Sequence, residues 1–384
     1  MRHTSERPGA EGPPTAPGYL DAASSEPLHP AARAAMVAAL DKGYADPRRL
    51  HGQARNARLI LDNAREAVAG CLGVRADEVT FTPSGTHAVH LGVLGLLAGS
   101  ARQGSHLVVS AVEHSSVLHA GAWHAARGGT VTTLPVDRTG RLDVDAVGPS
   151  SPTVLAVQSA NHEVATVQPV ARAAELAGGA PVFVDACASM GRMPLPDGWS
   201  VAAGSAHKWG GPAGVGVLLV RKGTRWRNPF PGDDRVDERA TGFENVPAAL
   251  AAAAALQAVV DDSTTVERHR SLTARIRQEV GALPDVELFG DPVDRLPHLV
   301  AFSCLYVDGE ALVTDLDRAG LGVASGSACT ASTLTPSHVL EAMGVLTHGN
   351  LRVSLARDTT ESEVSELLDA LPVLIRRIRA EAGL

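Results

Sequence analysis

The sequence is poor in cysteine, has no excess of basic residues and has no long hydrophobic run. Its 384 residues include four cysteines and no C-x-x-C pair, which argues against a disulfide framework and against the usual spacing of a zinc site. Lys and Arg number 34 against 42 Asp and Glu, so a surface that follows nucleic-acid phosphates is not expected. The most apolar stretch, residues 248–260, is too short to cross a bilayer. We therefore expect neither a direct nucleic-acid partner nor a membrane partner.

The first 18 residues carry no hydrophobic period. They hold four prolines and three glycines, and we predict a flexible tail over residues 1–18. The same segment lacks the apolar stretch of a signal peptide. Together with the few cysteines, this favours a cytoplasmic location.

Helical patterns alternate with short β-branched runs from residue 19 onward. Helices are predicted over 30–40, 54–72, 86–97, 116–127 and 170–177. Strands are predicted over 78–82, 106–110, 130–135, 153–158, 181–185 and 216–220. Short, continuously apolar strands that alternate with helices predict an α/β fold with a mainly parallel sheet covered on both faces.

The pattern changes near residue 260. An Ala-rich helix begins at Pro247, and a charged helix follows over 265–282. Strands near 287 and over 300–306 precede helices over 310–319 and 361–382. We therefore predict a large domain over 19–260, whose first few residues join a smaller α+β domain over 261–384.

The segment Thr82-Pro-Ser-Gly-Thr86 follows a predicted strand and opens a predicted helix. Amide groups at a helix start, together with the hydroxyls of Ser84 and Thr86, can hold a phosphate. The same pattern is more often only a helix N-cap. Both interpretations stay open on this motif alone.

An acid and a lysine follow at the ends of apolar segments. Asp185 ends a predicted strand, where ligands of open α/β sheets bind, although a strand-end Asp also commonly caps a turn. Lys208 lies in Ser205-Ala-His-Lys-Trp-Gly-Gly, an apolar setting typical of lysines that form Schiff bases. The three features in this order indicate pyridoxal phosphate, whose pyridine nitrogen the acid would keep protonated and whose aldehyde the lysine would bind.

Cys329 differs from the other cysteines in its surroundings. Small and polar neighbours in Ser-Gly-Ser-Ala-Cys329-Thr-Ala-Ser predict an exposed loop. Cys304 in a strand-like run and Cys71 at an apolar helix end are interpreted as inert core thiols, and Cys187 has no motif. An ordinary thiol is only about 3% thiolate at pH 7, so Cys329 would need a base or a cation nearby to act.

Nine segments carry a resemblance to one enzyme family. They are YLDAAS (19–24), LHGQA (50–54), VTFTPSGT (79–86), VEHSSVL (112–118), ANHEVATVQP (160–169), VDA (184–186), SAHKWGGPAGVG (205–216), SGSACTAS (325–332) and LRVSLAR (351–357). The chain resembles the pyridoxal-phosphate-dependent cysteine desulfurases of the class V aminotransferase group. The resemblance implies a fold-type I transferase with a seven-stranded central sheet. The segment around Cys329 is similar to the long-loop subgroup that supplies iron–sulfur cluster assembly and thiolation pathways.

The resemblance implies a role for each matched residue. Lys208 would hold pyridoxal phosphate, Asp185 would pair with its ring nitrogen, and His114 would stack on the ring and relay a proton. The residues around the phosphate would be Ser84, Gly85, Thr86, Ser205 and His207. Arg352 would clamp the substrate carboxylate, beside Asn161 and Asp46.

Four positions depart from the family pattern. Ala188 stands where the family has a Gln that binds the cofactor phenol oxygen, and His162 stands at a usual Asn, where its ring could take over that bond. Phe243 replaces a Thr that usually reaches the phosphate of the neighbouring subunit. Asp46 replaces an Asn, so it would place a carboxylate near the substrate carboxylate unless it is protonated.

The resemblance implies that L-cysteine becomes L-alanine while its sulfur passes to Cys329 as a persulfide and then to an acceptor protein. It also implies a homodimer with the sites at its interface. Two alternatives stay open: a related enzyme acting on another substrate such as selenocysteine, and a non-catalytic scaffold that binds sulfur-acceptor proteins. Intact Lys208, Asp185, His114 and Cys329 argue against the scaffold.

Overall fold

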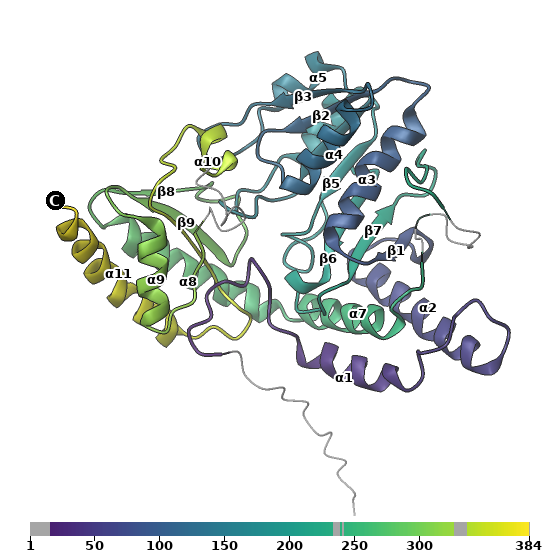
Figure 1. Ribbon diagram of the computed structural model, residues 1–384, viewed down its shortest axis with the longest axis horizontal. Helices are drawn as coiled ribbons and strands as arrows, with labels where there is room; N and C mark the ends of the chain where they lie inside the picture. Colours follow the sequence, from purple (N-terminus) through teal and green to yellow (C-terminus); the bar gives the residue numbers. More distant parts are fainter. Residues whose placement is uncertain (1–15, 233–238, 240–241, 326–335, 384) are drawn as a thin grey trace, which may run out of the picture.

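The computed structural model describes residues 16–232, 239, 242–325 and 336–383. Within these ranges the chain forms two sheets, each with its own helices, which lie side by side as two lobes (Figure 1). Cys329 and most of the predicted tail lie outside the described residues. Gly18 is described, and its amide donates a 2.8 Å hydrogen bond to Glu363.

The larger sheet has seven strands in the order β1-β7-β6-β5-β4-β2-β3. They are β1 (Val79–Thr82), β2 (His106–Ser110), β3 (Thr130–Leu134), β4 (Val154–Gln158), β5 (Val182–Asp185), β6 (Val201–Ser205) and β7 (Gly216–Val220). The four pairings from β3 to β6 are parallel, whereas β7 pairs antiparallel with both β1 and β6. The predicted α/β class and mainly parallel sheet are confirmed.

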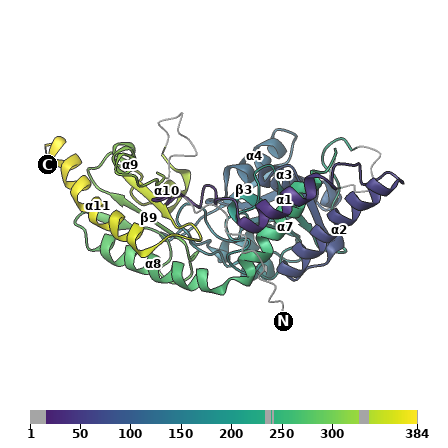
Figure 2. The ribbon, with the colours of Figure 1, turned by 90° about the horizontal axis from the view of Figure 1, so that it is seen from below.

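Helices cover both faces of this sheet, because successive side chains along its strands point alternately into two hydrophobic cores. On β5, Val182 and Val184 pack in a core shared with α1 (Pro30–Leu40), α2 (Gly52–Leu72), α6 (Val170–Leu176) and α7 (Val246–Asp261). Phe183 packs on the opposite face with α3 (Gly85–Ser100) and α4 (Ser115–Ala125). Both α1 and α2 pack on α7, and α1 runs beside α7 in Figures 1 and 2. A short α5 (Val147–Ser150) lies at the edge near β3.

The smaller sheet is antiparallel, with the order β10-β9-β8. Its strands are β8 (Val286–Leu288), β9 (Leu299–Cys304) and β10 (Asn350–Ser354). The helices of this lobe are α8 (Ser263–Gly281), α9 (Gly309–Arg318), α10 (His338–Met343) and α11 (Glu361–Glu381). Bridges from Tyr19 to Gly322 and from Asp21 to Ser354 bring the start of the described chain to this lobe.

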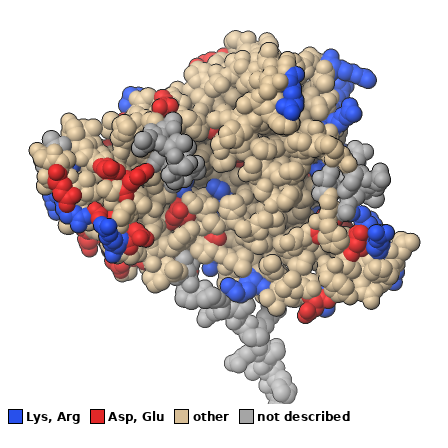
Figure 3. Space-filling view, in the orientation of Figure 1, with Lys and Arg blue, Asp and Glu red and all other residues tan. Residues whose placement is uncertain are grey.

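Charged side chains gather over α9 and α11 and near the end of α2, whereas much of the face between them is uncharged (Figure 3). Among the described helices, none alone has the length and hydropathy of a membrane span, although α7 and α8 meet these criteria together as a pair bent by 69°.

Candidate active site

One cavity opens at the carboxyl ends of three neighbouring strands. Gln158, Asp185 and Ser205 are the last residues of β4, β5 and β6, and all three line a cavity of about 250 Å³. This edge is where open α/β sheets bind ligands, because the helix starts and strand ends converge there. The structure thus gathers most of the predicted cofactor residues in one place: Gly85, Thr86, His114, His162, Asp185, Ser205, His207 and Lys208.

One end of the cavity is formed by the start of α3 against the end of β6. A Cβ atom on Gly85 would lie 2.5 Å from the Cβ of Ser205, so glycine is required for this close approach. The first amides of α3 have no acceptor within the helix, and Ser205 Oγ lies 3.1 Å from Nδ1 of His207. Amides, a hydroxyl and an imidazole at a helix start suit a phosphate.

Ser84 does not line the cavity. Its Oγ accepts the amide of His87 at 3.0 Å and thereby caps α3. The N-cap interpretation therefore holds for this side chain. Its O–H donor is not used by the cap, so the contact of Ser84 with a phosphate stays a prediction.

Asp185 and Lys208 face the same cavity from β5 and from the turn after β6. Asp185 is buried, and its Oδ1 accepts the amide of Cys187 at 2.9 Å. Lys208 ends a 3-10 turn (Ala206–Lys208), and its Nζ donates to the carbonyl of Ala23 at 2.8 Å. Burial and the neighbouring Asp185 raise the pKa of Cys187 well above its usual range, so this thiol stays protonated.

Two histidines form the wall beside Asp185. The ring of His114 meets the ring of His162 edge-on, with 5.0 Å between centroids and 70° between planes. The amide of Ser116 donates to Nδ1 of His114, which caps α4 and fixes that ring. Burial lowers the pKa of His114, and it lowers the pKa of His162 further, with the charge of His114 as the next cause. Both rings are therefore neutral at pH 7.

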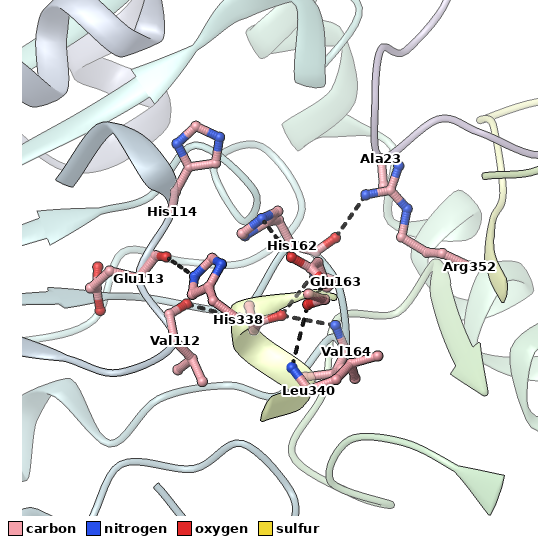
Figure 4. Close-up of polar contacts among 12 residues, drawn as sticks. Ala23, Val112, Glu113, His114, His162, Glu163, Val164, His338, Leu340 and Arg352 are labelled. Carbon is pink, nitrogen blue, oxygen red and sulfur yellow. Dashed lines mark hydrogen bonds and ion pairs between the residues drawn. The ribbon is translucent and has the colours of Figure 1, made fainter. Parts of the chain in front are cut away.

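Two buried carboxyl groups, which sequence reasoning missed, belong to the chain neighbours of these histidines, Glu113 and Glu163 (Figure 4). Glu113 accepts hydrogen bonds from Ser110 Oγ at 2.6 Å and from the Gln158 amide at 2.9 Å, and burial raises its pKa to about 8. Glu163 accepts a hydrogen bond from Ser337 at 2.6 Å, and burial also raises its pKa. Their positions in the sequence could have pointed to them, because Glu113 directly precedes His114 and Glu163 directly follows His162.

Arg352 lies on β10 of the smaller sheet and reaches the turn that carries His162. Its Nη2 donates to Asp21 at 2.8 Å and to Ser24 at 2.6 Å, while its Nη1 donates to the carbonyl of His162 at 3.2 Å. Its Nε is buried and has no partner among the described residues. Arg352 therefore adjoins the cavity through His162 but is not part of its lining.

Asn161 and Asp46 are not among the residues that line the cavity in this chain, and their place beside the substrate stays a prediction. Asn161 is fully buried, and its side chain is occupied by the amides of Glu163 and Val164 and by the Val112 carbonyl. Asp46 lies between α1 and α2, where it accepts the amide of Arg48.

Two of the residues that depart from the family pattern and two of the other cysteines lie at different places in the structure. Ala188 lines the cavity, and Phe243 is 55% exposed near the start of α7. Burial raises the pKa of Cys71, and it raises the pKa of Cys304 to about 11, as expected for unreactive thiols.

The lining fits pyridoxal phosphate. A buried carboxylate suits a protonated pyridine, a lysine suits an aldehyde, and the start of α3 suits a phosphate. The cavity volume is slightly below the roughly 300–1,000 Å³ of ordinary ligand pockets, as suits a single-ring cofactor.

Comparison with known proteins agrees with this chemistry. The model of the family "Aminotransferase class-V" matches residues 18–367. A "Cysteine desulfurase" of Cereibacter sphaeroides is 38% identical over 378 residues, with 94% of this chain and 96% of that protein covered. "Cysteine desulfurase IscS" of Dictyoglomus turgidum is 33% identical over 374 residues, with 94% and 95% covered. The structure of a "NifS-like protein" superposes with a TM-score of 0.84 at 25% identity and covers 96% of this chain and 99% of that one.

Proposed function

Because the chain belongs to the class-V aminotransferase family, we propose that it is a pyridoxal-phosphate-dependent cysteine desulfurase. It converts L-cysteine to L-alanine and passes the sulfur to an acceptor protein. The observation that carries the proposal is the cavity in which Asp185, Lys208 and the start of α3 meet. The names of the relatives at 33–38% identity supply the substrate.

The bound cofactor supplies an aldehyde that joins to amines and a ring that withdraws electrons from the substrate Cα–H bond. Asp185 holds the proton on the pyridine nitrogen. The amides of Gly85 and Thr86, with Ser205 and His207 beside them, bind the phosphate. Lys208 would hold the cofactor through Nζ, and its amine would be the base that takes the Cα proton of the substrate.

His114 and Cys329 handle the sulfur. His114 is neutral, because burial lowers its pKa. It would relay the proton of the substrate thiol. The Cys329 thiolate attacks the substrate sulfur, so that an S–S bond forms while the Cβ–S bond breaks. The electron pair of the broken bond stays on Cβ, which gains a proton and leaves as part of L-alanine. The acceptor protein then collects the persulfide sulfur, for iron–sulfur assembly or a thiolation pathway.

Arg352 binds the substrate carboxylate in this proposal. Its guanidinium can form two parallel hydrogen bonds to a carboxylate, which a lysine cannot do. Its Nη2 donates hydrogen bonds to Asp21 and Ser24, which orient the guanidinium group. The substrate carboxylate would share these donors with Asp21, beside the ring of His162.

A second copy of the chain is the proposed partner at the α1–α2 end. Large apolar side chains are exposed there, and Leu50 is 91% exposed. The others are Val37, Leu40, Tyr44, Leu59 and Phe243. A monomer rarely leaves so many apolar side chains in one region uncovered. A homodimer would bury them and would place Asp46 at the subunit interface.

We also propose the predicted division into a large domain over 19–260 and a small domain over 261–384, supported by the separate sheets and by the bridges from Tyr19 and Asp21 to the smaller lobe. The proposed location is the cytoplasm, supported by the free thiols of Cys71, Cys187 and Cys304 among the described residues.

The direct test is alanine and sulfide release from L-cysteine by the protein loaded with pyridoxal phosphate, with and without candidate acceptor proteins. Lys208→Ala should lose both alanine formation and the visible absorbance of the bound cofactor. Lys222→Ala changes an exposed lysine and should keep both. Loaded protein that releases alanine from selenocysteine but not from cysteine would overturn the proposed substrate. Protein that binds no cofactor would favour the scaffold.

A further inference from the structure

The turn that carries Lys208 is held from outside at three of its carbonyl groups. The carbonyl of Lys208 accepts a hydrogen bond from Nη2 of Arg192 at 3.3 Å. The carbonyls of His207 and Gly210 accept main-chain amides of residues 26–29, each at 2.8 Å, and we call this segment the strap. The main chain around the proposed cofactor lysine is therefore fixed by residues that are distant in the sequence.

The strap approaches the turn so closely that it needs a glycine there. Gly210 has a φ of +82°, and a Cβ atom on it would lie 3.2 Å from the Cβ of His29 and 3.2 Å from the carbonyl oxygen of Pro27. The left-handed backbone and the narrow gap both favour glycine. The strap and the turn therefore pack with their main chains against each other.

Glu26 of the strap also reaches the turn through its side chain. Its Oε2 accepts Nη2 of Arg192 at 2.6 Å, and the same nitrogen donates to the carbonyl of Lys208. The side chains of Glu26 and Arg192 are 3% and 9% exposed, so little water competes for this contact. The carboxyl group of Glu26 therefore orients the guanidinium group that binds the main chain at Lys208.

The second carboxyl oxygen of Glu26 makes a contact with the smaller lobe. Oε1 accepts the amide of Arg357 at 2.9 Å, and Nη1 of Arg357 donates to the carbonyl of Pro27 at 3.0 Å. Arg357 lies shortly after β10, the strand that carries Arg352. One carboxyl group thus joins the turn of Lys208 to the chain segment of Arg352, and these are the residues proposed to hold the cofactor and the substrate carboxylate.

Stability alone does not explain a buried ion pair, because the loss of hydration roughly cancels the attraction between the charges. We propose that Glu26 is a positioning residue for Lys208, which it fixes through Arg192. Through its contact with Arg357, it also sets the separation of Lys208 from the lobe that carries Arg352. This role rests on the proposed function, because it concerns the lysine that would hold the cofactor.

Two substitutions made together remove the contact without leaving a buried charge. Glu26→Gln or Arg192→Met alone would leave the other charge buried without its partner and would destabilise the fold strongly. The double variant Glu26→Gln/Arg192→Met removes both charges. Its glutamine side chain keeps an oxygen for the amide of Arg357, so the link to the smaller lobe is retained while the hold on the Lys208 carbonyl is lost.

Hydrogen–deuterium exchange of the full-length protein without cofactor measures the turn directly. In the wild-type turn the amides of Trp209 and Gly211 donate to the carbonyl of Ala206. The double variant should exchange the amides of residues 206–211 about threefold to tenfold faster. Ser337→Ala removes a buried hydrogen bond at α10 and should leave exchange over this range unchanged. Equal exchange in the double variant and wild type, or an equal rise in Ser337→Ala, would overturn the proposal.

The visible absorbance of the protein loaded with pyridoxal phosphate separates positioning from a purely structural role. Its pH midpoint depends on where the turn places Nζ of Lys208 relative to the cofactor. The double variant should move this midpoint by about 0.5 pH unit or more, which is a threefold change in the protonation equilibrium. Arg275→Met/Glu279→Gln removes an exposed ion pair of α8 and should not move it. An unmoved midpoint in the double variant would overturn the positioning role.

Failure of the proposed function gives a different result. It would appear as wild-type protein that releases no alanine from L-cysteine. The exchange measurement needs neither cofactor nor substrate, so it tests the hold of Glu26 on the turn of Lys208 whichever reaction the protein catalyses.

Discussion

The hydroxyl of Ser337 donates a buried 2.6 Å hydrogen bond to the carboxyl group of Glu163. The same hydroxyl accepts the amide of Leu340 at 3.3 Å and so caps α10. One side chain therefore fastens the start of α10 to the turn that carries His162, and the two residues lie 174 positions apart in the sequence.

Ser337→Ala should lower the free energy of unfolding by about 1–3 kcal/mol, because the substitution removes a helix cap and leaves a buried carboxyl without its donor. Urea denaturation measures the change. Ser362→Ala is the matched control, since Ser362 bonds Glu366 on the exposed face of α11, and it should change stability by less than about 0.5 kcal/mol. An equal effect of the two substitutions would show that the Ser337 contact does not stabilise the fold.

Because of Glu113, the free energy of unfolding should fall as the pH rises. Burial raises the pKa of its carboxyl from 4.5 to about 8, so the folded chain keeps a proton that the unfolded chain releases above pH 4.5. The stabilisation is complete below pH 4.5 and is lost as the pH approaches 8, at about 1.4 kcal/mol per pH unit for one proton.

Unfolding midpoints between pH 5 and 8 measure this slope. Glu113→Gln mimics the protonated form and should flatten the decline, whereas Glu66→Gln changes an exposed residue of α2 and should keep the wild-type slope. A wild-type slope in Glu113→Gln would mean that another group carries the pH dependence.

The fold was predictable wherever one local pattern dominated. The predicted helix over 30–40 and strand over 216–220 match α1 and β7 because proline at a helix start and a continuous apolar run are local signals. β6 has the sequence Val-Ala-Ala-Gly-Ser, whose small residues carry little strand propensity, and β10 has Arg352 at its centre. These two strands were missed because their partners in the sheets, and not their own residues, determine them.

The candidate site was likewise predictable from the sequence only in part. Asp185 and Lys208 were predictable because each ends an apolar segment, and parallel strands bring such ends to one edge. The pairing of Arg352 with Asp21 joins positions 331 apart, and nothing in the sequence near either residue signals it.

Arg352→Lys should raise KM for L-cysteine about tenfold and change kcat less. A lysine keeps the charge but loses the paired hydrogen bonds to the substrate carboxylate, and this loss weakens substrate binding before the sulfur reacts. Steady-state kinetics measure the split. Arg376→Lys makes the same change at an exposed position of α11 and should leave both constants within about twofold. A fall in kcat alone would place Arg352 in a step after substrate binding.

Cys329→Ala should keep the visible absorbance of the bound cofactor and lower cysteine-dependent alanine release by at least about 100-fold, because the cofactor groups stay intact while the sulfur nucleophile is lost. Cys71→Ala is the control, since burial raises the pKa of that thiol and keeps it protonated, and alanine release should stay within about twofold of wild type. Alanine assays and absorbance spectra of the three proteins, loaded under the same conditions, separate the two effects. Substantial alanine release by Cys329→Ala would assign the sulfur to another acceptor. Of the three remaining thiols, Cys187 lines the cavity but is held protonated by burial and by Asp185, so that acceptor would have to be an external thiol.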